Sequence, residues 1–151
     1  MILPDVNVLV YGFRRDAERH GEYRSWLSGI LNGDSAFGVS EQVLAALVRV
    51  STHPRVFQTP SPLGEALQFV NALRSHPLCR TIRPGERHWA LFTDLCARSA
   101  AKGNLIPDAW NAALAIESGC VWITTDRDYA RFPGLAWKHP LDHESVIENP
   151  A

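Results

Sequence analysis

The stretch MILPDVNVLVYGF, residues 1–13, places Asp5 between a short apolar run and an apolar helical pattern. Residues 1–4 predict a buried strand and residues 6–13 predict a helix, which is how an α/β fold begins. A residue that directly follows a parallel strand lies at the carboxyl edge of the sheet, where α/β proteins bind their ligands. This stretch therefore predicts a fold class and also the position of a functional site.

The rest of the chain continues the alternation of strands and helices. Strands are expected at 36–39, 79–82, 120–124 and 135–137. Helices are expected at 18–31 and 84–100, and in segments that start at Ser40, around 59–62 and at Pro107. The tail after Pro140 is expected to lie on the surface. This order predicts one domain over residues 1–151, an α/β/α sandwich whose mainly parallel central sheet is flanked by helices.

Two of the expected helices carry apolar residues at helical spacing, which predicts their buried faces. The helix after 59–62 should bury Leu63, Leu67, Val70 and Leu73. The helix at 84–100 should bury Trp89, Phe92, Leu95 and Cys96.

Composition is typical of a soluble globular protein: 46% of the 151 residues are hydrophobic and 21% are charged. No apolar run approaches the ~20 residues of a membrane span, and the first residues do not resemble a secretory signal. Three cysteines without C-x-x-C spacing predict reduced thiols. We therefore expect a cytoplasmic protein.

The basic residues are almost all arginines, thirteen against two lysines, in a chain with a net charge of −1. Arginine suits bidentate contacts with phosphate, although a GC-rich genome also explains the excess. Arg14, Arg15, Arg19 and Arg24 lie close together after the first helix. If the acidic residues gather in one cleft, the remaining surface must be net positive, a pattern that suits a nuclease.

Four acidic residues lie at predicted junctions between strands and helices or turns: Asp5, Glu41, Asp108 and Asp126. Each could be only a helix cap or a turn residue. If they converge, two like charges ~4 Å apart cost ~4 kcal/mol at an effective dielectric near 20. A fold with a stability of ~5–15 kcal/mol needs a cation to offset several such repulsions. A gathered cluster therefore predicts a divalent metal site.

Three motifs in this order resemble the PIN-domain family and, within it, the VapC toxins of toxin–antitoxin pairs. They are D-x-N-V-L at 5–9, D-A-x-x-A-A-L-A at 108–115 and T-x-D-R-D-[FY] at 124–129. The runs RVSTHPRVF at 49–57 and FPGL at 132–135 resemble one actinobacterial subgroup. The resemblance spans nearly the whole chain. It implies a PIN fold and a Mg²⁺-dependent endoribonuclease in which Mn²⁺ can substitute.

By the same resemblance, Asp5, Asp108 and Asp126 match the family's metal-binding acids. Asn7 and Thr124 match polar residues that support those acids, and Asp128 matches an outer or second-metal acid.

This chain departs from the family pattern in the third helix, where Ala45 and Ala46 replace the glutamate that many relatives carry. Glu41 lies one turn earlier, about 40° away around the helix, so its long side chain could reach the same pocket. We assign it the role of fourth catalytic acid.

The resemblance also implies a cognate VapB-like antitoxin, a homodimer, and a structured RNA substrate such as tRNA or rRNA. Two alternatives remain open at this point. A catalytically inactive PIN scaffold is compatible with the missing glutamate. A haloacid-dehalogenase-like phosphatase is disfavoured because its Asp-x-Asp motif would need an acid where Asn7 stands.

Overall fold

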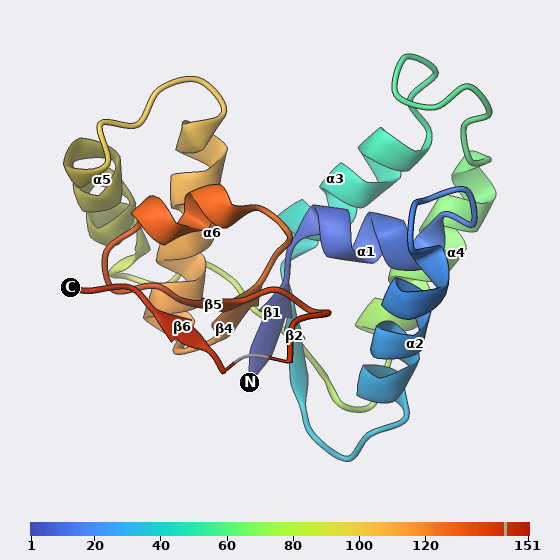
Figure 1. Ribbon diagram of the computed structural model, residues 1–151, viewed down its shortest axis with the longest axis horizontal. Helices are drawn as coiled ribbons and strands as arrows, with labels where there is room; N and C mark the ends of the chain where they lie inside the picture. The colour runs from blue at the N-terminus through green and yellow to red at the C-terminus, as the bar shows by residue number, and fades with distance from the viewer. Residues whose placement is uncertain (144) are drawn as a thin grey trace.

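A mainly parallel sheet forms the centre of the computed structural model, which describes residues 1–143 and 145–151 (Figure 1). Its strand order is β1-β4-β5-β6, with β1, β4 and β5 parallel and β6 antiparallel to β5. These strands are β1 (Ile2–Pro4), β4 (Val121–Ile123), β5 (Ala136–Lys138) and β6 (Ile147–Glu148). The predicted strand at the start of the chain therefore lies beside the strand that precedes Thr124.

A second, two-stranded parallel sheet is made of β2 (Phe37–Val39) and β3 (Cys79–Thr81). Gly38 brings β2 close to β1, because a Cβ at this position would lie 3.2 Å from the Ile2 carbonyl oxygen and 2.9 Å from Ile82 Cγ1. A larger residue would push the two strands apart. This close approach sets the position of the helix that follows β2.

Helices pack on both sides of the strands (Figure 1). They are α1 (Val6–Phe13), α2 (His20–Leu31), α3 (Glu41–Ser51), α4 (Leu63–Arg74), α5 (His88–Arg98), α6 (Leu105–Ser118) and the 3-10 helix η1 (Arg127–Arg131). Helices α1 to α4 gather on one side and α5 with α6 on the other. The predicted α/β fold with a mainly parallel sheet between helices is confirmed. Among the described residues, no helix is long and apolar enough to cross a membrane.

Helix α6 begins at Leu105, two residues before the predicted start at Pro107. Proline is tolerated here because the N–H groups of a first helical turn have no partner within the helix. The inner face of α6 is made of small residues, and Ala109, Ala112 and Ala113 are fully buried. Asp108 thus lies just inside the helix rather than at its cap.

The predicted inner faces of α4 and α5 are partly wrong. Leu63 and Leu67 are 58% and 41% exposed, and Trp89 is 65% exposed. In α5 the predicted Leu95 is buried, but so is the neighbour of Trp89, His88, whose ring nitrogen Nε2 lies 3.0 Å from the carbonyl oxygen of Trp110. A histidine with a hydrogen-bond partner can be buried. Helical spacing alone does not show which edge of an apolar helix face packs against the core.

The C-terminal tail is also closer to the core than predicted. Strand β6 pairs with β5, and Asn149 is buried. The Asn149 side chain accepts a hydrogen bond from Trp137 Nε1 at 3.0 Å and donates to the carbonyl oxygens of Tyr129 and Phe132 at 2.9 and 2.8 Å. These contacts tie the tail to η1, the segment that follows Asp126.

Candidate active site

Asp5 and Thr124 meet because the neighbouring parallel strands β1 and β4 end side by side. The Asp5 amide donates to the Ile123 carbonyl oxygen at 2.8 Å, which continues the ladder by one residue. The Thr124 hydroxyl donates to Asp5 Oδ2 at 2.7 Å, and the Val6 amide donates to Asp5 Oδ1 at 2.6 Å. Asp5 is only 5% exposed. It is therefore both the cap of α1 and a buried acid at the carboxyl edge of the sheet.

Asp126 is held by the same threonine. Its amide donates to Thr124 Oγ1 at 3.0 Å, and its Oδ1 accepts from the Asp128 amide at 2.8 Å, which caps η1. The Thr124 hydroxyl thus connects two of the predicted metal-binding acids. Asp128 itself is exposed and forms an ion pair with Arg131 at 3.6 Å.

Asp108 reaches the site from α6 and is held by Tyr129. The Tyr129 hydroxyl donates to Asp108 Oδ1 at 3.2 Å and accepts from Asn111 Nδ2 at 3.3 Å. Asn111 lies one helical turn after Asp108, and its Oδ1 is buried without a hydrogen-bond partner among the described residues. A buried acceptor of this kind needs a water or a cation to satisfy it.

The electrostatics show that these acids influence one another. The pKa of Asp5 is raised to about 6, chiefly by burial and also by the charges of Asp108 and Asp126, against the opposing hydrogen bonds from Thr124 and Val6. Burial also raises the pKa of Asp108, with smaller contributions from Asp126 and Asp128. The pKa of the Tyr129 hydroxyl is raised by burial and then by Asp5 and Asp108. Negative charge accumulates here, and no arginine or lysine among the described residues contributes to lowering these pKa values.

Glu41 lies in a different environment. Its carboxylate accepts from Arg74 at 3.0 Å and from Arg83 at 2.7 Å. These contacts, led by the Arg74 hydrogen bond, lower the pKa of Glu41. Its side chain is 46% exposed and does not perturb the pKa of Asp5 or Asp108. The structure therefore gathers Asp5, Asp108 and Asp126 but leaves Glu41 in an ion-paired position, and its catalytic role stays a prediction.

Asn7 also stands apart from the acids. It is exposed in the first turn of α1, and within the described residues its side chain makes no hydrogen bond to Asp5, Asp108 or Asp126. Its supporting role stays a prediction as well.

The donor set suits a hydrated divalent cation. Among the described residues, no three His, Cys, Asp or Glu side chains come together closely enough to enclose a metal ion. Magnesium does not need such a cage, because it keeps several waters and uses one or two carboxylates. A bound cation would favour the ionised forms of Asp5 and Asp108, whose pKa values are raised, and the unpaired Asn111 Oδ1 needs a water or a cation. Asp5, Asp108 and Asp126 are therefore the candidate ligands of an open site for a divalent cation.

Sequence reasoning missed the residues that hold Asp108 in place. Tyr129 stands in the T-x-D-R-D-[FY] motif but was given no role, and Asn111 is a polar residue on the otherwise apolar inner face of α6. That polar interruption is a signal that could have identified Asn111. The role of Asn149 has no comparable local signal, because its partners are 17 and 20 residues away.

Comparison with known proteins identifies the family and the fold. Residues 2–135 match the PIN domain family. The chain is 44% identical over 147 residues to VapC ribonuclease Mb2897 of Mycobacterium bovis, which covers 97% of this chain and 100% of the relative. It is 39% identical over 140 residues to ribonuclease VapC25 of Mycobacterium tuberculosis, covering 93% and 99%.

Among solved structures, VapBC2 from Rickettsia felis, bound to a DNA fragment from its promoter, superposes with a TM-score of 0.67. The match has 19% sequence identity and covers 92% of this chain and 98% of that one. VapC20 of Mycobacterium tuberculosis, a toxin that cleaves the sarcin–ricin loop, superposes with a TM-score of 0.66 at 14% identity, covering 86% and 93%. At these identities the superpositions support the fold.

Proposed function

The chain belongs to the PIN domain family, and from this premise we propose that it is a VapC-type endoribonuclease toxin that requires Mg²⁺ or Mn²⁺. The domain spans residues 1–151. The substrate is a structured cytoplasmic RNA such as tRNA or rRNA, and a VapB-like antitoxin neutralises the enzyme. The protein acts as a homodimer. The observation that carries this proposal is the gathering of Asp5, Asp108 and Asp126 without a compensating cation.

Each residue of the site has a distinct part in the proposed chemistry. Asp5, Asp108 and Asp126 hold the cation, and Asp128 shapes the turn that positions Asp126. Thr124 orients Asp5 and the Asp126 backbone, while Tyr129 and Asn111 orient Asp108. When bound, the divalent cation supplies positive charge to the scissile phosphate and lowers the pKa of water. The buried side of the site limits the approach of bulk water to Asp5.

The relatives' names support the partner and the reaction. The similar proteins include ribonucleases, and the similar structures include a toxin–antitoxin complex. The PIN domain match leaves no support for the phosphatase alternative. An inactive scaffold remains distinguishable by experiment, because it would bind RNA without cutting it.

The decisive test combines RNA cleavage with metal binding. Replacing Asp108 with Asn removes a charged ligand, so cleavage of total cellular RNA should fall more than about a hundredfold, the equivalent of several kcal/mol of transition-state stabilisation. In the parent protein, Mg²⁺ at about 100 times its Kd should stabilise the fold by about 2.7 kcal/mol. Thermal melts at increasing Mg²⁺ concentration measure this shift, which should be smaller in the Asp108→Asn protein.

Asp94→Asn is the matched control, since Asp94 is an exposed acid on α5 paired with Arg98. It should leave both cleavage and the metal-dependent melt unchanged. Equal cleavage by the Asp108→Asn and parent proteins, together with a melt that does not respond to metal, would refute the metal-nuclease proposal.

A further inference from the structure

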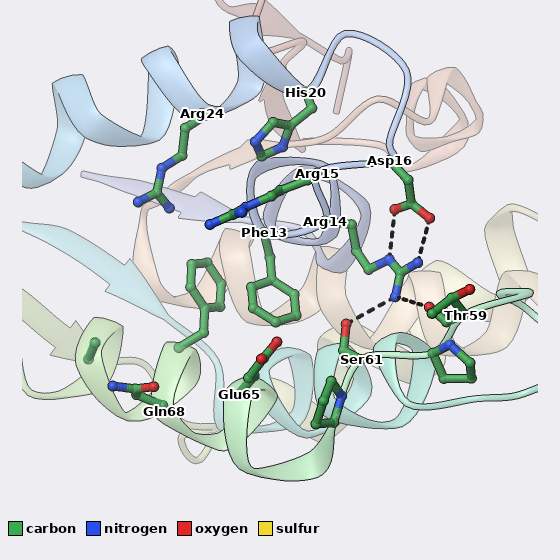
Figure 2. A pocket seen from close by; sticks show the side chains of 14 residues that line it. Phe13, Arg14, Arg15, Asp16, His20, Arg24, Thr59, Ser61, Glu65 and Gln68 are labelled. Atoms are coloured by element: carbon green, nitrogen blue, oxygen red, sulfur yellow. Dashed lines mark hydrogen bonds and ion pairs between the residues drawn. The ribbon is translucent and has the colours of Figure 1, made fainter.

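A groove of about 990 Å³, drawn in Figure 2, is lined by Phe13 and Arg14 at the end of α1, whereas Asp5 caps the start of that helix. It is lined by the end of α1, the turn into α2, residues 59–62 and one side of α4. The eight residues of α1 correspond to about 12 Å of helix. The groove is therefore separate from the acids but close enough for the same extended ligand to reach both.

One wall of the groove is fixed by Arg14, which is only 7% exposed. Its Nη1 donates to the Thr59 carbonyl oxygen at 2.9 Å and to Ser61 Oγ at 3.0 Å, and its Nε donates to Asp16 Oδ1 at 2.9 Å. Its guanidinium lies 3.8 Å above the Phe57 ring. These contacts hold the 57–62 segment against α1. The ion pair with Asp16 offsets the positive charge of Arg14.

Two other arginines of the groove keep their charges available. Arg15 and Arg24 are exposed, and neither forms an ion pair with any residue that the structure describes. His20 lies beside them in Figure 2 and directs Nδ1 to the Tyr11 carbonyl oxygen at 2.8 Å. The acids of the groove are Asp16, which is paired with Arg14, and Glu65 on the opposite wall. The Arg15 and Arg24 side is thus a local positive surface in a chain of net charge −1.

An aromatic pair lines the same groove as these arginines. The rings of Phe13 and Phe69 are 4.7 Å apart at 31° to each other, and both residues line the groove half-buried. Proteins bind single-stranded nucleic acid with arginine guanidinium groups that contact phosphate oxygens and with neighbouring aromatic rings that contact bases. This groove offers both kinds of group.

We infer that this groove binds a single-stranded stretch of the RNA substrate next to the cleavage site, with Arg15 and Arg24 on its phosphates. The inference rests on the proposed ribonuclease function and extends it, because it assigns the substrate a second contact surface about one α1 length from the acids. Charge complementarity favours RNA: the free cations are arginines, which contact phosphate in a bidentate way.

The test measures RNA binding in the Asp108→Asn background, so that the RNA stays intact. A fluorescently labelled single-stranded RNA of mixed sequence is titrated by anisotropy at several salt concentrations. Arg15→Ala/Arg24→Ala should bind about tenfold more weakly, and its salt slope should be shallower by about 1.4, about 0.7 for each lost phosphate contact. Arg15→Lys/Arg24→Lys keeps both charges and should keep the slope. Thermal melts check that each variant is folded.

The control is Arg87→Ala/Arg98→Ala, which removes two exposed arginines at α5, across the molecule from the groove (Figure 1); Arg98 is paired with Asp94, whereas Arg87 forms no ion pair among the described residues. It should leave the affinity within about twofold of the background protein. An equal loss in both alanine variants would overturn the inference, because charge anywhere on the surface would then be sufficient. Unchanged RNA binding by Arg15→Ala/Arg24→Ala, with lost binding of poly-glutamate, would also overturn it and assign the groove to an acidic peptide.

The same experiment separates this inference from the proposed function. If the Asp108→Asn protein binds the RNA and the Arg15→Ala/Arg24→Ala change has no effect, only the groove assignment fails. If the Asp108→Asn protein binds no RNA at all, the ribonuclease proposal and the groove assignment fail together.

Discussion

Asp5 and Glu41 follow neighbouring strands at the same edge of the structure, yet their surroundings are opposite. Asp5 is buried, shares its site with Asp108 and Asp126, and has a pKa raised to about 6. Glu41 is half-exposed, accepts from Arg74 and Arg83, and has a lowered pKa. Arg74 and Arg83 neutralise the Glu41 carboxylate, whereas no arginine or lysine among the described residues lowers the pKa of Asp5.

This difference shows how a metal site can be distinguished from an ordinary acidic surface. An acid such as Glu41 needs nothing further, because two guanidinium groups already offset its charge. Asp5 keeps its charge at neutral pH only at a cost in stability, unless a cation enters. The candidate site is therefore defined less by the number of acids than by the lack of basic partners around them.

Replacing Asp5 with Asn should produce the largest change in stability, measured without metal. The raised pKa means that the folded state holds the proton between about pH 4 and 6 while the unfolded state releases it, so stability falls as pH rises through this window. Above it the ionised Asp5 costs about 3 kcal/mol. Asn caps a helix equally well. Urea denaturation with EDTA should show Asp5→Asn to be more stable at pH 8 and equal to the parent near pH 4.

The control for this comparison is Asp94→Asn, an exposed acid whose change should alter stability little at either pH. An Asp5→Asn protein that is no more stable than the parent at pH 8 would mean that the buried carboxylate carries no electrostatic cost. The contrast with Glu41 would then lose its basis.

Replacing Tyr129 with Phe should have an intermediate effect, seen in the pH dependence of cleavage. The Tyr129 hydrogen bond lowers the pKa of Asp108 against the effect of burial, so its removal should raise that pKa and move the acidic limb of the cleavage profile to higher pH. Loss of such an outer hydrogen bond should also reduce cleavage about tenfold. Single-turnover cleavage across pH measures both effects.

Tyr11→Phe is the matched hydroxyl deletion, since within the described residues the Tyr11 hydroxyl makes no hydrogen bond. It should leave the pH dependence of cleavage unchanged. If Tyr129→Phe lowers the rate but leaves the acidic limb unchanged, Tyr129 contributes to packing and does not position Asp108 through its hydrogen bond.

If Glu41 keeps its Arg74 and Arg83 contacts when RNA binds, replacing it with Gln should have the smallest effect, because these contacts are exposed and such pairs contribute little. Cleavage should change by less than about fivefold. Arg74→Gln removes the contact between Arg74 and Glu41, and it should change cleavage by a similarly small factor. A much larger loss for Glu41→Gln alone, with an unchanged melt, would instead make Glu41 a catalytic acid that leaves its arginines when RNA binds.

Most of the fold was predictable because strands and helices alternate in this chain with clear periodicity. The predictions of burial were wrong where the local sequence pattern and the tertiary contacts disagree. Trp89 has the spacing of a core residue but is exposed, since His88 occupies the buried position. The tail was predicted to lie on the surface, yet Asn149 is buried because it satisfies three partners on β5 and η1.

By itself the sequence determined that Asp5 and Asp126 follow strands and that Asp108 lies at the start of a helix. Parallel topology then brings such positions to one edge of the sheet. Only the tertiary structure decided how the acids are held: Thr124 reaches Asp5 across 119 residues, and Tyr129 reaches Asp108 across 21. It also decided that Arg74 and Arg83 neutralise Glu41. The physical reason is that local periodicity encodes which face of an element is apolar, whereas a carboxylate's charge state depends on the groups that packing places around it.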